Sequence, residues 1–334
     1  MSPQRPDVIA IVGATASGKT ATSLELAFLL GLHNDFAFPV EIISADSRQV
    51  YRLLDIGTAK PSLADRAAVP HHFIDERNPD ETFSAGDFAR EASERIADIR
   101  RRGNIPIIVG GAGLYIQALT EGFFDDTLTH EASLDDATQV AHLRKKALQD
   151  ERLRLQQEYA AHGIQPLVEE LRQHDPISAQ KYADGNPRRI MRALEYYRAT
   201  GMRFSEAHQQ YHKPAGFTTR FFGIHVERSE LYRRINIRSQ QMFDNGLLEE
   251  TAVVLARGYS PNCNALNTVG YKEAIACLHG HLSKTQAIEQ IQLHTRQYAK
   301  RQLTWFRRSP HIEWLTGTPD SIAHEILTRL RNPF

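Results

Sequence analysis

The sequence predicts an α/β protein, a doubly wound parallel sheet that carries a mostly helical insertion domain. Two patterns lead to this fold class. Short apolar runs of strand length alternate with longer helical stretches along most of the chain, and a region near the middle interrupts the alternation without any strand-like run. A length of 334 residues also exceeds what one compact core usually needs, which favours an insertion.

Each expected strand is a nearly continuous apolar run, as in a sheet that helices cover on both faces. The strands are expected at residues 8–12, 40–44, 105–109, 221–226 and 312–315. Between them, composition and apolar periodicity predict helices at residues 21–30, 85–102, 231–257 and 285–307. Strands that alternate with helices in this way indicate a parallel sheet.

The expected domain organisation has three segments. Residues 1–124 and 215–334 form the first and second parts of the sheet core, and the second part ends in a basic helix. Residues 125–214 form the helical insertion, which is dense in Arg, Gln, Glu and Ala. Within it, Pro166, Pro176 and Pro187 are expected to mark helix starts or turns.

Composition limits how the protein can meet a charged partner. The 40 basic and 40 acidic residues cancel, so contact with a polyanion must come from local basic patches. Cys263 and Cys277 match no metal or redox spacing and are expected to be reduced thiols. With no signal peptide and no run of about 18 apolar residues, we expect a soluble cytoplasmic protein that does not enter a membrane.

The segment GATASGKT fits the phosphate-binding pattern G-x-x-x-x-G-K-[ST] in full, directly after the first expected strand and before a helix. Gly13 and Gly18 permit the turns that direct backbone N–H groups into one concavity. Lys19 adds a positive charge, and the Thr20 hydroxyl can hold Mg²⁺. The motif predicts a P-loop NTPase-like sheet with a di- or triphosphate site. It does not specify the phosphate ester and leaves a nucleotide kinase open.

Asp46 follows the second expected strand in the segment SADSRQVYRLLDIGTAKP. The carboxyl ends of adjacent parallel strands face one crevice, so Asp46 is expected near the phosphate loop. There a carboxylate could bind Mg²⁺ or take a proton from an acceptor. The competing interpretation is a helix N-cap at Asp46 or Ser47.

Nine segments together resemble one enzyme family. They are GATASGKT, ADSRQVY, DIGTAKP, PHHFID, FSAGDF, PIIVGGAGLY, RRIMRALE, VGYKE and KRQLTWFRR, and their order and spacing closely resemble the tRNA dimethylallyltransferases, also called tRNA isopentenyltransferases. The resemblance extends from about Val8 to Trp314. It implies transfer of a dimethylallyl group from dimethylallyl diphosphate to N6 of the tRNA adenosine 3′-adjacent to the anticodon.

The resemblance assigns the donor site and the catalytic base. Asp46 falls on the family's catalytic aspartate, Arg228 matches an arginine that the family places on the diphosphate, and Thr20 would hold Mg²⁺. The phosphate loop would bind the donor diphosphate rather than ATP, through Gly13, Ala14, Thr15, Ala16, Ser17, Gly18, Lys19 and Thr20.

The resemblance also implies contacts with the tRNA anticodon stem-loop. Taken alone, each basic cluster is better interpreted as a solvated helix face, and the family placement reverses that preference. On the helix expected at 285–307, Ile288, Ile291, Tyr298 and Trp305 form a separate apolar stripe that we interpret as core packing. The implied RNA contacts are Asp46, Ser47, Arg48, Gln49, Ala112, Arg152, Arg188, Arg189, Arg192, Asn267, Thr268, Val269, Gly270, Tyr271, Lys272, Arg296, Lys300, Arg301 and Arg307.

This chain departs from the family pattern in two places. It reads GGAGLY where relatives usually read GGTGLY, so Ala112 lacks a hydroxyl that commonly meets the substrate. The stretch 125–150 is longer than the usual linker and has no family template. The zinc finger of some eukaryotic relatives is absent, which favours a bacterial type, and we expect a monomer.

Three alternative functions stay open on the sequence. The first is prenyl transfer to a free adenine nucleotide, against which the insertion and the basic C-terminal helix speak. The second is a small-molecule kinase, to which the phosphate loop alone would point. The third is a non-catalytic RNA-binding module, which the intact Lys19, Thr20 and Asp46 disfavour.

Overall fold

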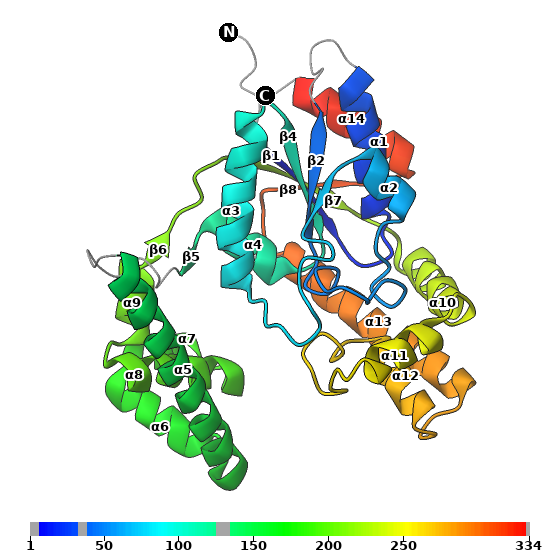
Figure 1. The fold of residues 1–334 in the computed structure, drawn as a ribbon. Helices are drawn as coiled ribbons and strands as arrows, with labels where there is room; N and C mark the ends of the chain where they lie inside the picture. Colours follow the sequence, from blue (N-terminus) through cyan, green and yellow to red (C-terminus); the bar gives the residue numbers. More distant parts are fainter. Residues whose placement is uncertain (1–6, 33–38, 125–133, 332–334) are drawn as a thin grey trace. The chain divides into compact units, whose positions relative to one another are not determined.

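The computed structural model describes residues 7–32, 39–124 and 134–331. The chain forms two compact units. The first combines residues 1–121 with 215–334, and the second comprises residues 122–214. Figure 1 shows both units.

The first unit is built on a six-stranded sheet in the order β3-β2-β4-β1-β7-β8, with every neighbouring pair parallel. This confirms the predicted fold class. One strand, β3, was not expected, because two residues are too short to form a recognisable apolar run. The strands are β1 (Val8–Gly13), β2 (Val40–Ala45), β3 (His71–His72), β4 (Ile105–Gly110), β7 (Thr219–Ile224) and β8 (Ile312–Leu315).

The register brings the ends of three strands level. Gly110 of β4 lies opposite Val12 of β1 on one side and Ala45 of β2 on the other. The residues that follow these strands therefore leave the same edge of the sheet. They are the phosphate loop, the segment that begins at Asp46, and the glycine-rich loop after β4.

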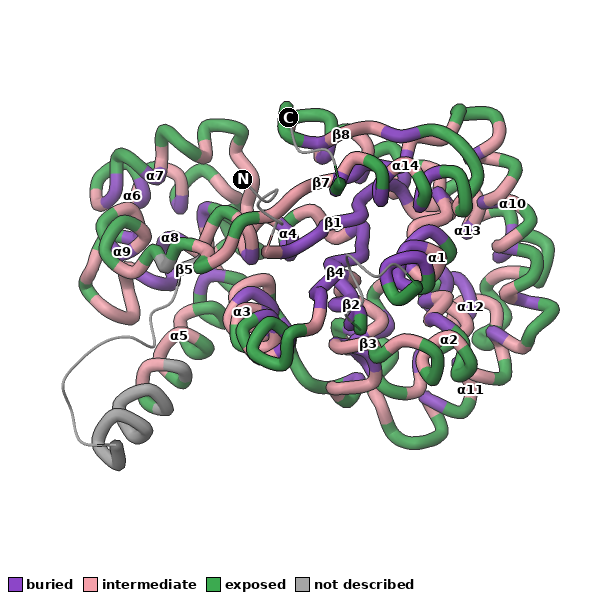
Figure 2. Tube along the Cα trace, turned by 90° about the horizontal axis from the view of Figure 1, so that it is seen from above, coloured by how far each residue is buried: buried purple, intermediate pink, exposed green. Residues whose placement is uncertain are grey.

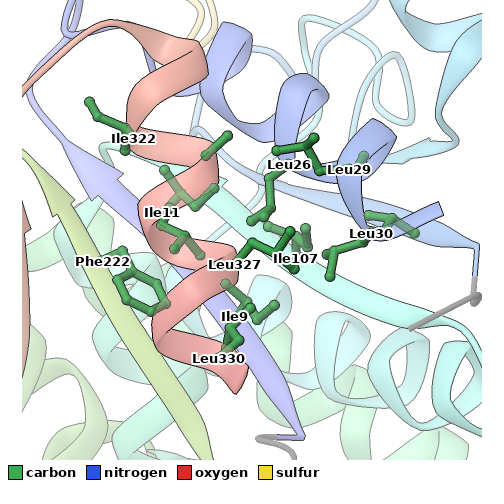
Figure 3. Packing of buried hydrophobic residues seen from close by; sticks show 14 of the residues in the cluster. Ile9, Ile11, Leu26, Leu29, Leu30, Ile107, Phe222, Ile322, Leu327 and Leu330 are labelled. Carbon is green, nitrogen blue, oxygen red and sulfur yellow. The ribbon is translucent and has the colours of Figure 1, made fainter. Parts of the chain in front are cut away.

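Helices cover both faces of the sheet. On one face, α1 (Lys19–Leu32) and α14 (Pro319–Arg331) pack against each other and against the strands. Figure 3 shows side chains of this core, including Ile9 and Ile11 of β1. On the other face, α3 (Ala85–Arg101) and α4 (Gly113–Glu121) pack together, with an aromatic cluster beside them. The cluster consists of Phe73, Phe83, Phe88 and Tyr115.

The strands at the centre of the sheet are buried along their whole length, as Figure 2 shows for β1, β2 and β4. Two of the flanking helices begin with a capping box. Ser84 caps α3, and Ser283 caps α13 (Lys284–Phe306), each through its own hydroxyl and a polar side chain three residues on.

One helix prediction was wrong in extent. Residues 231–257 form two helices, α10 (Arg228–Asp244) and α11 (Leu247–Ala256), instead of one. Gly246 separates them with φ of +97°, a backbone conformation that glycine adopts readily and that a continuous helix excludes. The first unit also contains α2 (Leu63–Ala68) and α12 (Tyr271–Leu278).

The second unit is mostly helical, as predicted, with its own apolar core. Among the residues that the structure describes in this unit, one sheet is present, a short antiparallel pair that the sequence did not predict. Residues 125–133 of the long linker lie outside the described residues. The elements are β5 (Phe123–Phe124), α5 (Leu134–His162), α6 (Gln165–His174), α7 (Pro176–Lys181), α8 (Pro187–Thr200), α9 (Phe204–Gln210) and β6 (His212–Lys213).

The buried side chain of Asp175 connects the starts of two helices in the second unit. Its carboxylate is buried and accepts hydrogen bonds from the backbone N–H and the hydroxyl of Ser178, and from the same two groups of Ser205. These bonds cap α7 and fix the first turn of α9. Together they hold the pKa of Asp175 below its ordinary value, although burial acts in the opposite direction as the largest single cause.

Candidate active site

A cavity of about 340 Å³ lies at the edge of the sheet where the phosphate loop begins. The phosphate loop, the segment after β2 and the loop after β4 each contribute to its wall, and α10 and α13 contribute the rest. Its lining includes Thr15, Ala16, Gly18, Lys19, Thr20, Ser44, Asp46, Gln49, Thr58, His71, Gly110, Gly111, Arg234, Arg238, Tyr298 and Gln302.

The phosphate loop has the backbone that its glycines predict. Gly13 and Gly18 have φ of +151° and +100°, and Ala16 has φ of +61°. A Cβ on Gly13 would lie 3.1 Å from the Ile224 carbonyl oxygen, so this position also needs glycine for space. The loop therefore forms a concavity at the N-terminus of α1, a place that favours anions.

Lys19 lies inside this concavity. Its Nζ donates to the Ala14 carbonyl at 2.6 Å. Burial lowers the pKa of Lys19 to about 8, the Asp46 carboxylate opposes that shift, and the Arg238 guanidinium adds to it. A bound diphosphate would supply negative charge and raise this pKa again.

Asp46 stands at the start of a turn after β2, so it is not the helix N-cap that the sequence left open. Its Oδ1 accepts the N–H groups of Arg48 at 2.8 Å and Gln49 at 3.4 Å, so the carboxylate does cap the turn that follows β2. It also lines the cavity beside the phosphate loop. No other described residue donates a hydrogen bond to Asp46, so Oδ2 is available to a substrate.

Of the residues implied to touch the target adenosine, the structure brings Asp46 and Gln49 to the cavity wall, and neither Ser47 nor Arg48. The Gln49 side chain accepts from the Ser44 hydroxyl at 2.9 Å and donates to the carbonyls of Thr58 and Ala59, both at 3.2 Å. The Arg48 guanidinium instead donates to the Asn264 carbonyl.

The structure does not bring Arg228 to the cavity, contrary to the sequence interpretation. Arg228 is exposed at the first turn of α10, and its Nε donates to the Tyr232 hydroxyl at 3.1 Å. Arg234 and Arg238, farther along the same helix, line the cavity instead. The i, i+4 spacing of these two arginines in RRINIR was the signal that the sequence analysis missed.

Helix α13 contributes Tyr298 and Gln302 to the cavity. The core interpretation was wrong for Tyr298, because this side chain lines the cavity. Burial nevertheless raises the pKa of Tyr298 well above its ordinary value. It was right for Ile288 and Ile291, which are buried. Gln302 was not predicted as a site residue at all.

Two residues of the segment 267–272, Gly270 and Tyr271, are buried, so their side of the segment is not at the surface in this conformation. The Tyr271 hydroxyl donates to Glu250 at 2.5 Å, and its ring packs where a Cβ on Gly57 would lie 2.5 Å away. Glu250 also accepts the N–H groups of residues 55–57. Gly270 is buried beside them, whereas Asn267 and Lys272 are exposed and Thr268 and Val269 partly so.

The arginine and lysine side chains of the predicted basic clusters differ in exposure and in whether they form ion pairs. In the second unit, Arg152 and Arg192 both pair with the buried carboxylate of Glu195, at 2.9 Å and 2.7 Å, so they also hold that unit together. Arg188 and Arg189 are exposed at the start of α8. On α13 and just after it, Lys300, Arg301 and Arg307 are exposed, and Arg296 stacks on Tyr232.

Comparison with known proteins places the chain in a family. Residues 49–309 match a family model described as IPP transferase. The chain is 41% identical to a tRNA dimethylallyltransferase of Syntrophotalea carbinolica over 313 residues, which cover 93% of this chain and 91% of the relative. This chain belongs to the IPP transferase family. A family member from Bacillus cereus, named tRNA dimethylallyltransferase, is 38% identical over 97% of this chain and 94% of its own.

Solved structures of family members share the fold. A tRNA isopentenylpyrophosphate transferase from Bacillus halodurans is 35% identical, with a TM-score of 0.64 over 97% of this chain and 96% of its own. A eukaryotic dimethylallyltransferase acting on tRNA is 28% identical, with a TM-score of 0.72 over 93% of this chain and 74% of its own. The resemblance seen in the sequence is thereby confirmed. Among the helices that the structure describes, none is long and apolar enough to cross a membrane.

Proposed function

We propose that the protein transfers the dimethylallyl group of dimethylallyl diphosphate to N6 of adenosine 37 in tRNA, which gives N6-isopentenyladenosine. One observation carries the proposal. The phosphate loop with Lys19 and the carboxylate of Asp46 line the same cavity, so a diphosphate ester and a base meet in one site. Membership of the IPP transferase family selects prenyl transfer among the reactions that such a site allows.

The donor diphosphate would lie in the phosphate loop. Loop N–H groups and the α1 N-terminus favour its negative charge, and Lys19, Arg234 and Arg238 add positive charge around it. As the allylic C–O bond breaks, negative charge accumulates on the leaving diphosphate. Fixed cations already placed around that position stabilise the charge better than solvent would.

Asp46 would act as the general base. The adenine amino group is a weak nucleophile, because its lone pair is delocalised into the ring. A carboxylate beside it can accept its proton as the C–N bond forms. The Oδ1 bonds from Arg48 and Gln49 fix the orientation of the carboxyl group and leave Oδ2 for this proton.

The residues present fit Mg²⁺. The Thr20 hydroxyl lines the cavity and is an oxygen donor of the kind that Mg²⁺ prefers. Among the residues that the structure describes, no cluster of three or more His, Cys, Asp or Glu could hold a metal. Mg²⁺ would therefore be held largely by the donor phosphates, and it would neutralise part of their charge.

The tRNA would be held by cations outside the cavity. Exposed Arg188 and Arg189 lie on α8, and exposed Lys300 and Arg301 lie on α13. Phosphate contacts of this kind supply affinity without sequence information. The target base must leave its stack in the anticodon loop to reach Asp46. We also propose that the protein is a cytoplasmic monomer.

One assay separates the candidate functions. Dimethylallyl diphosphate labelled in the allyl group is incubated with bulk tRNA, AMP and Mg²⁺. Label in tRNA supports the proposal, and label in AMP would support the free-nucleotide alternative instead. A parallel reaction with ATP tests the kinase alternative, for which acceptor-dependent ADP release would be the sign.

A second experiment tests the RNA surface. Arg188→Gln and Lys300→Gln remove exposed charges, and each should raise the KM for tRNA and reduce its salt dependence. The KM for dimethylallyl diphosphate should stay constant, because neither residue lines the cavity. An equal rise of both KM values would assign these residues a structural role. Arg192 is unsuitable here, since its loss would also weaken the pairing of buried Glu195.

A further inference from the structure

Gln302 joins two loops that leave neighbouring strands of the sheet. Its Oε1 accepts the Thr15 N–H at 2.8 Å, and its Nε2 donates to the Gly111 carbonyl at 2.9 Å. Thr15 belongs to the phosphate loop after β1, and Gly111 to the loop after β4. The Gln302 side chain is buried and lines the cavity. One side chain therefore sets the spacing of the two loops.

Steric fit reinforces these hydrogen bonds. A Cβ on Gly111 would lie 2.1 Å from Gln302 Nε2 and 3.3 Å from the Gly13 carbonyl oxygen. One turn farther along α13, Trp305 occupies the space beside Gly113, where a Cβ would lie 2.3 Å from the indole Cδ1. Two side chains of α13 thus fit against two glycines of one loop, and that loop cannot shift unless the helix moves too.

Only an amide satisfies both partners. Thr15 presents a donor and Gly111 an acceptor, and a glutamine side chain offers one acceptor and one donor. A carboxylate would place a second oxygen against the Gly111 carbonyl. An apolar side chain would leave the Thr15 N–H and the buried Gly111 carbonyl without this partner.

The bridge also changes what Thr15 can do in the phosphate loop. N–H groups of such loops usually point at the bound phosphate. The Thr15 N–H is committed to Gln302 instead, and the Thr15 hydroxyl accepts from Arg238 Nη1 at 3.3 Å. Thr15 is therefore held on both sides, as a fixed point of the loop rather than as a ligand for charge.

We propose that Gln302 is a positioning residue for prenyl transfer. It ties the phosphate loop, which holds the donor, to residues 110–113, which include the predicted RNA contact Ala112, and so keeps the allylic carbon aligned with the adenine N6. The inference rests on the proposed function. In the transfer, the C–N bond forms as the C–O bond to diphosphate breaks, and the N6 proton passes to Asp46.

Loss of this alignment would favour a competing reaction. Water then attacks the same allylic carbon, its oxygen forms the new C–O bond, diphosphate leaves, and the proton goes to solvent. The products are dimethylallyl alcohol and diphosphate. The share of the consumed donor that ends as alcohol therefore reports how well the two loops are aligned.

The test uses Gln302→Glu and Gln302→Met with a donor labelled in the allyl group, and measures label in tRNA and in dimethylallyl alcohol. The kcat for tRNA prenylation should fall about 10- to 100-fold, as expected for a small displacement of reacting groups. The alcohol share should rise severalfold. Gln297→Glu and Gln297→Met are the matched controls, because Gln297 is exposed on the same helix, and they should leave the alcohol share at the wild-type value.

A merely structural role gives a different result. Fewer folded molecules would lower both products in parallel and leave the alcohol share unchanged. An unchanged share in both Gln302 variants overturns the inference, whether activity is kept or lost. If the wild type fails to label tRNA, the proposed function itself is refuted. If the wild type transfers label and the share does not change in the variants, only the role of Gln302 is refuted.

Discussion

The lowered pKa of Lys19 predicts that donor binding weakens as pH rises through about 8. The diphosphate binds the ammonium form, so affinity is present below this pKa and is lost above it. Going from pH 7 to pH 9, the charged fraction falls from about ten elevenths to about one eleventh, and kcat/KM for dimethylallyl diphosphate should fall about tenfold. The terminal phosphate of the donor ionises near pH 6 and contributes little in this window.

The assay is kcat/KM for the donor at saturating tRNA, measured from pH 6.5 to 9.5. Lys19→Arg carries a permanent charge and should flatten the profile, and Lys19→Ala should flatten it at much lower activity. A flat wild-type profile would refute the reasoning, as would an unchanged slope in Lys19→Ala. The pH dependence of stability is a second test of the lowered pKa of Lys19. The unfolded state binds the extra proton between pH 8 and 10.5, so the contribution of Lys19 to the free energy of unfolding rises across that window.

Three further predictions concern the assigned site residues. Asp46→Asn should lower kcat about 100-fold or more while tRNA affinity stays near wild type, and near-normal turnover would exclude Asp46 as the base. Arg238→Ala should raise the KM for the donor about tenfold or more, whereas Arg228→Ala should leave it within about twofold. A larger rise in KM for Arg228→Ala than for Arg238→Ala would support the assignment of Arg228 to the diphosphate. Ala112→Thr should stay active, with kcat/KM for tRNA unchanged or raised up to about tenfold by one added hydrogen bond, and a large loss would show a pocket shaped around alanine.

The sequence predicted the parts of the site that one local motif determines. The phosphate loop follows from eight consecutive residues, and the approach of Asp46 follows from the rule that parallel strands end at one edge. The register confirms that rule, because Ala45 and Gly110 are paired. The reaction was predicted from the family resemblance, because neither the phosphate loop nor the Asp46 segment specifies it.

The remaining site residues depend on distances that no local pattern encodes. Tyr298 lies in an apolar stripe that resembles ordinary core, yet the turn of α13 that carries it faces the cavity. Arg228 was assigned to the diphosphate from the family resemblance alone. That Arg234 and Arg238 line the cavity depends on the direction of α10 past the phosphate loop, which no local pattern shows. Tyr271 was assigned to the RNA contact because the family resemblance places segment 267–272 there, and only the structure shows Glu250 beside it.

The order of strands in the sheet has a consequence for synthesis of the chain. β1 lies between β4 and β7, and α1 packs against α14, yet β7 begins at Thr219 and α14 ends at Arg331. About 200 residues separate the phosphate loop from β7, an interval of about 10–40 s at typical translation rates. Throughout that time one edge of β1 and the apolar side of α1 lack their partners, while residues 122–214 can already close their own core. The nascent protein thus passes through a stage with a folded insertion and an open sheet, on which chaperones and proteases compete with completion of the cavity.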